Sequence, residues 1–481
     1  MSADVFSARR DRFTAAIGDG VALIAASPET TRNRDVEHPF RQDSDFYYLT
    51  GFDEPDAVAL LDSNGDEPFV LFVRPKDKED ETWTGVRAGA EGAKERFSAD
   101  AAFPIRELES QLLERLQGRT TLYYRTAGST GTTVNRVLGR LRAWHDRTGK
   151  PIPIEVHDPG LLLAELRMRK TPEEVHDLRH ACEISVDAHL ESMRFTTPGR
   201  YEYQVKAALE YVFRTHGSSR NSYPSIVAGG ENACILHYTQ GDRKLQDGDL
   251  LLVDAGAEYG YQSADITRTF PVNGRFSAPQ RAIYDVVLTA HSEALAVCGP
   301  GSSLREVHEA GKRAISEGLI ELGLVPRALD DTLAMHLYRE YFMHGTSHWL
   351  GIDVHDVGTF KVDGEPRPLE PGMTFTVEPG IYVTPKDGPV EFSLLTYDMD
   401  EWSERRALLG TEAARKLERQ EVADAPRVEH PVPAEFHGIG ARVEDDILIL
   451  PGGNENLTAR LPTLPDDVEA VCGERSVLPV L

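Results

Sequence analysis

Short apolar runs alternate with longer helical patterns through about the first 160 residues of the chain. Consecutive apolar residues at 21–25, 57–61 and 69–73 have the length and composition of buried strands. The stretches 108–117 and 132–146 instead have the pattern of helices. Because strands alternate with helices here, the pattern predicts an α/β domain.

A helix start marks the opening of a second, larger domain. Thr171 is followed by Pro172 and, three residues after the threonine, by Glu174, which is the pattern of a capping box with proline at the first helical position. Apolar residues then recur at the spacing of one helix face: Val175, Leu178, Cys182, Val186 and Leu190. We therefore predict an N-terminal domain over residues 1–168 and a second domain over residues 169–481.

Two more helices are predicted in the second domain, over about 277–298 and 303–323. The segment 390–433 differs from its surroundings, because it is highly charged, has a helical pattern over about 400–420 and leaves through prolines. We interpret it as a surface excursion inserted between two core strands.

Composition narrows the class of protein. The chain has 481 residues, of which 40% are hydrophobic and 27% charged, as in a soluble globular protein with two or three domains. Its net charge of −26 argues against nucleic acid or an anionic membrane as a partner. Four cysteines without CxxC spacing, and no signal peptide or membrane span, predict free buried thiols in a cytoplasmic protein.

Two aspartates in the stretch LLLVDAGAEYGYQSADITRTFPV are the strongest local signal. An apolar run ends at Asp254, the pair Tyr259-Gly260 predicts a turn, and a second strand-like run carries Asp265. A turn centred on that pair would place the aspartates directly opposite each other, with Cβ atoms about 4.5–5.5 Å apart. Carboxylates that close repel unless a cation lies between them or one binds a proton. The alternative is a pair of solvent-facing aspartates, which suits the apolar run poorly.

Three histidines follow in FMHGTSHWLGIDVHDVG, at His344, His348 and His355. The glycines at 345 and 351 argue against a continuous helix, so this is not a helical HExxH zinc motif. Single histidines are usually structural, but three within twelve residues favour a function.

Further carboxylates adjoin strands near the end of the chain. Glu378 follows strand-like residues and precedes a proline-glycine turn, and GIGARVEDDILILP carries Arg442, Glu444, Asp445 and Asp446. Each alone could be an edge-strand charge. Taken together, the two aspartates Asp254 and Asp265, two glutamates and one or more histidines form an oxygen-rich donor set with imidazole and no thiolate, which favours manganese, cobalt, iron or zinc over copper. Four carboxylates can also neutralise and bridge two divalent ions about 3.5–4 Å apart.

These motifs resemble those of the pita-bread metallopeptidases, which include aminopeptidase P, prolidase and methionine aminopeptidase. The likeness covers about residues 171–460, and FRQDSDFYYLTGF in the N-terminal domain is similar to aminopeptidase P and prolidase. The resemblance implies an α/β N-terminal domain followed by an α+β pita-bread catalytic domain. It also implies a set of metal ligands: Asp254 on one ion, His348 and Glu378 on the other, and Asp265 and Glu444 bridging the two.

The same resemblance assigns roles in substrate binding and catalysis. His237 in ENACILHYT matches a histidine of the substrate site, and His355 matches one that steadies the scissile carbonyl. Glu378 is the expected proton shuttle on chemical grounds, because a ligand carboxylate beside the attacking water can reach its proton. The remaining matches are supporting positions: Tyr223 in the pocket, His344 and Arg442 near the proline side, and Trp83 in ETWTGVRAGA, which resembles a tryptophan offered by a neighbouring subunit.

The implied activity is hydrolysis of the bond between any N-terminal residue and a following proline in a peptide. It would use two divalent ions, with manganese the first choice and cobalt, zinc or iron as alternatives, in a homodimer or homotetramer. The stretches SHWLG and GIGARVEDD favour aminopeptidase P over prolidase, which cuts only dipeptides ending in proline.

Other members of the superfamily fit less well. Methionine aminopeptidases rarely carry an N-terminal domain of this kind, and a metal-free binding protein or a creatinase-like enzyme would have substitutions at the ligand positions. One departure concerns the 65 or so residues between Glu378 and Glu444, which short members replace by a brief loop. Two roles are open for this excursion: a cover over the mouth of the site or an oligomer contact.

Overall fold

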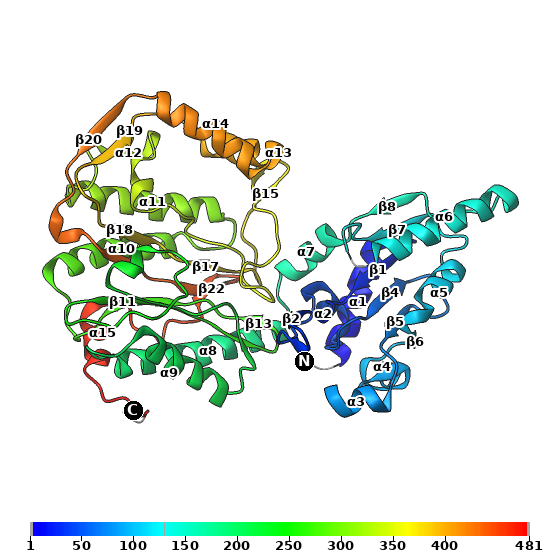
Figure 1. Ribbon diagram of the computed structural model, residues 1–481. Coiled ribbons are helices and arrows are strands. Elements are labelled where there is room, and N and C mark those ends of the chain that lie inside the picture. The colour runs from blue at the N-terminus through cyan, green and yellow to red at the C-terminus, as the bar shows by residue number, and fades with distance from the viewer. Residues whose placement is uncertain (1–2, 129, 479–481) are drawn as a thin grey trace. The chain divides into compact units, whose positions relative to one another are not determined.

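The computed structural model describes residues 3–128 and 130–478, and the chain divides into two compact units, Met1–Arg167 and Met168–Leu481 (Figure 1). The domain ends predicted at residues 1 and 481 lie outside the described residues. The boundary between the units falls one residue before the predicted boundary between 168 and 169.

The N-terminal unit is built on a six-stranded mixed sheet with the order β6-β5-β4-β1-β7-β8. Its central strand β1 pairs antiparallel with β4 and parallel with β7. The sheet strands are β1 (Val21–Ala25), β4 (Val58–Asp62), β5 (Phe69–Val73), β6 (Ala101–Pro104), β7 (Thr121–Tyr124) and β8 (Glu155–His157). The principal helices are α1 (Ala3–Ile17), α2 (Ser44–Thr50), α3 (Lys78–Thr84), α4 (Gly89–Phe97), α5 (Leu108–Arg115), α6 (Gly131–Thr148) and α7 (Gly160–Met168). The predicted α/β class is confirmed, because the three apolar runs form β1, β4 and β5 and the two helical patterns form α5 and α6.

The C-terminal unit places helix pairs on both sides of its strands (Figure 1). The predicted capping box is present at Thr171, and its helix α8 packs with α9 on one side. The predicted helices near 277–298 and 303–323 are present as α10 and α11, which pack together on the other side. The helices are α8 (Pro172–Phe195), α9 (Glu202–Thr215), α10 (Ala278–Ala296), α11 (Leu304–Glu321), α12 (Leu329–Ala334), α13 (Met399–Leu409), α14 (Thr411–Asp424) and α15 (Pro465–Cys472). The strands that position the site are β10 (Ile226–Gly229), β11 (Leu250–Asp254), β12 (Ala257–Tyr259), β13 (Gln262–Ser263), β14 (Thr267–Pro271), β17 (Thr374–Val377), β18 (Gly380–Val383), β21 (Ile439–Arg442) and β22 (Asp445–Leu450).

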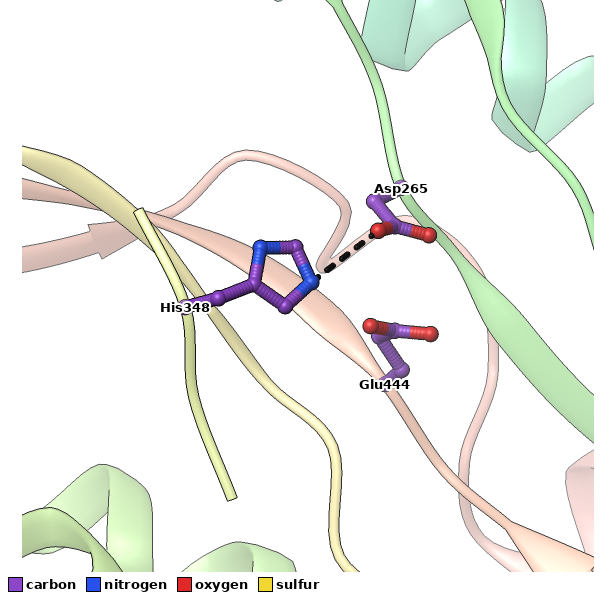
Figure 2. A group of neighbouring side chains, drawn as sticks. All are labelled: Asp265, His348 and Glu444. Carbon is purple, nitrogen blue, oxygen red and sulfur yellow. Dashed lines mark ion pairs between the residues drawn. The ribbon is translucent and has the colours of Figure 1, made fainter. Parts of the chain in front are cut away.

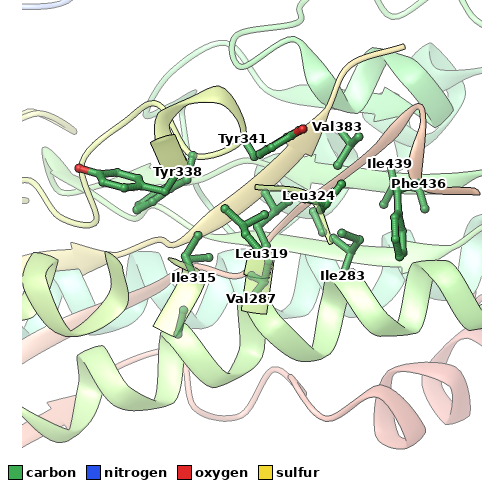
Figure 3. Close-up of a cluster of buried hydrophobic side chains, with 14 of the residues drawn as sticks. Ile283, Val287, Ile315, Leu319, Leu324, Tyr338, Tyr341, Val383, Phe436 and Ile439 are labelled. Carbon is green, nitrogen blue, oxygen red and sulfur yellow. The ribbon is translucent and has the colours of Figure 1, made fainter. Parts of the chain in front are cut away.

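A large buried apolar cluster fixes α10 and α11 on the strands (Figure 3). Ile283 and Val287 of α10 and Leu319 of α11 are fully buried against Val383 of β18 and Ile439 of β21, which is 8% exposed. Full burial of each such side chain stabilises the fold by about 1.5–3 kcal/mol. The strands that carry the polar residues therefore rest on a well-packed apolar layer.

The hairpin that carries the two aspartates turns one residue later than predicted. Gly260 and Tyr261 both have positive φ, at 56° and 67°, as the two central residues of a type I′ hairpin turn require. This turn places Asp254 opposite Thr267, so the predicted direct opposition of Asp254 and Asp265 is wrong. Asp265 stands two residues before Thr267 and is thus a diagonal neighbour of Asp254, for which about 7–8 Å between Cα atoms is usual.

The segment 390–433 is a hairpin that carries two helices. Strands β19 (Val390–Ser393) and β20 (Arg427–His430) pair antiparallel, and α13 and α14 lie between them. The single helix predicted over about 400–420 is wrong, because Gly410, with φ of 80°, separates two helices. The excursion leaves after β18 and returns before β21, two strands that pair with each other.

The cysteines are free thiols, of which Cys182 and Cys298 are buried while Cys234 and Cys472 are half-buried. No helix within residues 3–128 and 130–478 is long and apolar enough to cross a membrane.

Candidate metal centre and active site

A cavity of about 570 Å³ opens within the C-terminal unit. Every residue that the sequence analysis put in the site lines this cavity, apart from Trp83. The predicted residues found there are Tyr223, His237, Asp254, Asp265, His344, His348, His355, Glu378, Arg442 and Glu444. Part of the remaining wall is apolar and consists of Pro224, Ile226, Leu236 and Val354.

The strand ends deliver the carboxylates to one place. Asp254 is the last residue of β11, and Asp265 lies just before β14. Glu378 lies between β17 and β18, and Glu444 lies between β21 and β22. Because β17 pairs with β22 and β18 with β21 in a common register, Glu378 and Glu444 stand opposite each other although about 65 residues separate them.

Asp265, His348 and Glu444 form a compact group in which one ligand atom from each lies within 4.8 Å of the others. Figure 2 shows the imidazole of His348 facing the two carboxylates. His348 Nε2 lies 3.3 Å from Asp265 Oδ2 and 3.5 Å from Glu378 Oε1. The other ring nitrogen, Nδ1, is 3.0 Å from the carbonyl oxygen of Trp349, so it carries the hydrogen and leaves Nε2 as the ligand atom.

Burial and like charge make this group unfavourable without a cation. Burial, together with the charges of Asp265 and Asp254, raises the pKa of Glu378 to about 7 despite the opposing effects of His348 and Arg442. Burial followed by the charges of Asp265 and Glu378 raises the pKa of Glu444 well above its usual value. Burial alone would lower the pKa of His348, but the neighbouring carboxylates outweigh it and raise this pKa to about 9. A bound cation would offset the repulsion between these buried carboxylates. Carboxylate oxygens together with one imidazole nitrogen are ligands that suit divalent metal ions.

A hydrogen-bonded chain runs along the other wall of the cavity. Tyr223 donates its hydroxyl hydrogen to Asp254 Oδ1 at 2.5 Å, and Arg442 Nη2 donates to Asp254 Oδ2. Arg442 Nη1 also donates to the hydroxyl oxygen of Tyr382 at 2.7 Å. The Tyr382 hydroxyl in turn lies 2.9 Å from His344 Nε2.

The direction of these hydrogen bonds can be assigned. The Nδ1 atom of His344 lies 2.7 Å from the carbonyl oxygen of Gly345 and must donate to it. Burial, followed by the charge of Arg442, lowers the pKa of His344 to about 3, so the ring is neutral and Nε2 accepts from Tyr382. The chain therefore holds His344 and Arg442 in fixed orientations at the cavity wall.

Two histidines complete the lining. The ring of His355 lies 4.1 Å from that of His348 between centroids, and burial followed by the charge of His348 lowers the pKa of His355. His237 lines the same cavity. A neutral imidazole at His355 can donate a hydrogen bond to a substrate oxygen.

The structure separates Asp445 and Asp446 from this lining. Asp445 accepts a 2.6 Å hydrogen bond from Arg268 Nη2, and Asp446 accepts from the backbone nitrogen of Asp265 at 3.0 Å. Both aspartates are fully buried, so the alternative of exposed edge-strand charges does not apply to them. Burial followed by the charge of Asp265 raises the pKa of Asp446 well above its usual value.

Tyr382 and Thr267 were not predicted from the sequence to belong to the site. Tyr382 is a buried residue of β18, in the fully buried stretch GIYV, where a tyrosine looks like any core aromatic residue. Thr267 stands two residues after Asp265 and so faces the same side of the hairpin. That spacing was the one available signal for Thr267.

Neither Trp83 nor the excursion contributes a described residue to the lining of the cavity. Trp83 belongs to α3 of the N-terminal unit and is 84% exposed, so its role stays a prediction. Of the described residues that line the cavity, none belongs to 390–433.

Comparison with known proteins gives one family across both units. A model of metallopeptidase family M24 matches residues 176–451, and a model of the aminopeptidase P N-terminal domain matches residues 6–123. The chain is 39% identical over 476 residues to the Xaa-Pro aminopeptidase of Escherichia coli strain K12, with 98% of each chain covered. It is 38% identical to the Xaa-Pro aminopeptidase of Haemophilus influenzae, with 96% of each covered.

Solved structures of aminopeptidases are also similar to this chain over nearly its whole length. The aminopeptidase PepP of Pseudomonas aeruginosa matches with a TM-score of 0.87 and 39% identity, over 98% of each chain. The proline aminopeptidase P II of Yersinia pestis matches with a TM-score of 0.85 and 40% identity, over 98% of this chain and 99% of that one. The predicted architecture, an α/β domain followed by a pita-bread catalytic domain, is confirmed.

Proposed function

Because the chain belongs to metallopeptidase family M24 and is an Xaa-Pro aminopeptidase, we propose how the residues of its cavity divide the work. In this proposal Asp254 would hold one divalent ion, His348 and Glu378 would hold the other, and Asp265 and Glu444 would be shared by both. When bound, the ions supply Lewis-acid activation of a water molecule and of the scissile carbonyl. The observation that carries the proposal is the meeting of four carboxylates and His348 Nε2 in one buried cavity.

Two residues act directly on the reacting atoms, and a third holds the peptide. Glu378 accepts a proton from the attacking water and passes it to the proline nitrogen, which must be protonated to leave. His355 donates a hydrogen bond to the carbonyl oxygen as negative charge develops there. His237 lines the same cavity and holds the peptide beside Glu378 and His355.

The remaining residues select the substrate. The negative charge of Asp254 attracts the free α-amine of the peptide, which restricts cleavage to the first residue. Tyr223, His344 and Arg442 shape the side of the cavity that receives proline, and hydrogen bonds through Tyr382 and Asp254 fix their positions. We further propose that Trp83, which is 84% exposed, is offered to the site of a neighbouring subunit in a homodimer or homotetramer.

We propose manganese as the metal, because the donor set is rich in oxygen and has one imidazole, with cobalt, zinc or iron as alternatives. A cytoplasmic location is proposed on the ground that the four cysteines are free thiols. We also propose that the catalytic domain begins at residue 169, just before the helix that the Thr171 capping box opens.

Hydrolysis of Arg-Pro-Pro and of Gly-Pro by manganese-loaded protein, with a chelated control, tests the function. We expect cleavage of the tripeptide between arginine and proline, poor cleavage of the dipeptide and loss of both activities with chelator. Cleavage of the dipeptide alone would indicate a prolidase. Bound metal with no cleavage of either peptide would contradict the substrate while leaving the metal centre in place.

A further inference from the structure

Thr267 occupies a central place behind the proposed metal ligands, although it does not line the cavity. Its backbone stands opposite Asp254 in the β11–β14 ladder, and its carbonyl oxygen accepts a 3.1 Å hydrogen bond from the backbone nitrogen of Glu444. The side chain is fully buried. Thr267 therefore connects the strand that carries one proposed ligand to the segment that carries another.

The hydroxyl group of Thr267 bridges a gap between two charged side chains. Thr267 Oγ1 donates to Glu444 Oε2 at 2.5 Å and accepts from Arg442 Nε at 3.0 Å. Arg442 Nε is 4.0 Å from Glu444 Oε2, which is too far for a direct hydrogen bond. Threonine is thus the link that joins the guanidinium to the carboxylate.

The direction of this link is fixed by the chemistry of arginine. A guanidinium can only donate, so Thr267 Oγ1 must use a lone pair to accept from Arg442. Its single hydrogen is then available to Glu444, and one oxygen of that carboxylate is held in a defined direction. The same guanidinium donates to Asp254 Oδ2, so one chain of hydrogen bonds orients two proposed ligands that are distant in sequence.

We propose that Thr267 is a positioning residue that orients the carboxylate of Glu444 for the metal ions. The inference rests on the assignment of Glu444 as a ligand in the proposed function. Hydrogen bonds from residues behind the ligands commonly set ligand orientation, and their loss typically lowers metal affinity or activity by about 10–100-fold.

The same strand supplies a matched control. Thr269 is also fully buried, and its hydroxyl donates to the carbonyl oxygen of Arg442 at 3.1 Å and accepts from the backbone nitrogen of Arg442 at 3.1 Å. A valine at either position keeps the volume and removes one hydroxyl, but only Thr267→Val removes a hydrogen bond to a carboxylate.

The test compares metal binding by full-length Thr267→Val, Thr267→Ser and Thr269→Val. Manganese affinity is measured by competition with a chelating dye, and the melting temperature of each metal-free protein is measured beside it. We expect Thr267→Val to bind manganese about 10–100-fold more weakly than the unmodified protein. Thr267→Ser, which keeps the hydroxyl, and Thr269→Val should both stay within about threefold of the unmodified affinity, as expected where no ligand contact is lost. Thr267→Ala removes the same hydroxyl and replaces the valine variant if that one does not fold.

Several outcomes would overturn the inference. Unchanged manganese affinity in both Thr267→Val and Thr267→Ala would show that the hydroxyl does not orient a ligand. An equal loss in Thr269→Val would show a general effect of strand packing, and so would a loss that follows the melting temperatures of the metal-free proteins. If the unmodified protein binds no manganese, cobalt or zinc, the ligand assignment of the proposed function fails as well, so the two failures are distinguishable.

Discussion

Two hairpins of the C-terminal unit use charged residues in opposite ways. The β11–β14 hairpin has strands whose residues are all buried, and it carries Asp254 and Asp265 into the cavity. The β19–β20 hairpin of the excursion alternates exposed residues with buried or half-buried ones, and its charges form pairs such as Arg427 with Glu391 at 2.9 Å. The two partners of that pair are 39% and 52% exposed, so the pair stabilises the protein by at most about 1 kcal/mol.

Water solvates the exposed charges of the excursion hairpin, whereas the buried carboxylates of the site hairpin need a bound ligand to stabilise their charge. Burying a charged carboxylate beside other carboxylates costs a large free energy, which a bound cation offsets. An exposed carboxylate bears no such cost and can be replaced freely. The amino acid is therefore constrained at every position of the β11–β14 hairpin, whereas in the β19–β20 hairpin it is constrained only at positions that pack against the protein.

Removing one bridging carboxylate should have the largest effect. Asp265→Ala and Glu444→Ala should each lower kcat/KM for Arg-Pro-Pro by at least about 1,000-fold, because the metal ions lose a shared ligand. The matched control in the excursion is Glu429→Ala, an exposed glutamate on β20, which should stay within about twofold as surface substitutions usually do. Metal content measured beside the rates checks the cause, and an active, metal-free Asp265→Ala variant would refute the two-metal interpretation.

A substitution that disturbs the close packing of the β11–β14 hairpin should have the next largest effect, on the free energy of unfolding. A Cβ atom added at Gly256 would lie 1.7 Å from the carbonyl oxygen of Ala264, on the facing strand of the same hairpin. We expect Gly256→Ala to lower the free energy of unfolding by at least about 3 kcal/mol, because the backbones must separate. A Cβ atom at Gly452 meets nothing within 4 Å, so Gly452→Ala should change this free energy by less than about 0.5 kcal/mol. Chemical denaturation checks both, and equal stability of the two variants would contradict the tight hairpin.

The chemistry of the site could be read from the sequence better than its geometry. The types of Asp254, Asp265, His348, Glu378 and Glu444 already indicate divalent metal, because donor chemistry depends on composition. Their arrangement depends on pairing. Glu378 and Glu444 stand opposite each other through a register that about 65 intervening residues hide.

Turn chemistry explains the two local errors. The type I′ turn needs positive φ at both central residues, and Tyr261 adopts it beside Gly260, which propensity does not favour for tyrosine. In the excursion, continuous helix-forming residues hid the break at Gly410, since one glycine can be tolerated within a helical pattern. Tyr382 was missed for another reason: its hydroxyl acquires a role only through Arg442 and His344, which are distant in sequence.

A buried histidine behind the site hairpin predicts a pH dependence of stability. His189 Nε2 lies 2.9 Å from the carbonyl oxygen of Ala255, and burial lowers the pKa of His189 to about 4. Between pH 6.5 and 4 the unfolded chain binds a proton that the folded chain excludes, so stability falls as pH falls through this window. The loss attributable to His189 reaches about 3 kcal/mol.

Denaturation of metal-free protein between pH 7 and 4 measures this effect. His189→Gln should flatten the pH dependence of the free energy of unfolding between pH 6.5 and 4. An unaltered slope in His189→Gln would show that other groups govern acid stability.

Removing the helices of the excursion should have the smallest effect on catalysis. Ser393 pairs with Arg427 at the inner end of the β19–β20 ladder, so an Asn-Gly turn can replace residues 394–426 and close the hairpin. The deletion removes the stack of Tyr397 on Trp402 and the ion pair of Asp400 with Lys361 at 3.3 Å, but no residue that lines the cavity. We expect kcat/KM for Arg-Pro-Pro within about threefold of the intact protein, because losing exposed ion pairs costs at most about 1 kcal/mol. A loss above about 30-fold would instead mean that the excursion holds residues 336–348 in place through His336, whose Nε2 atom lies 2.9 Å from the carbonyl oxygen of Tyr397. The contrast between the two hairpins would then be wrong.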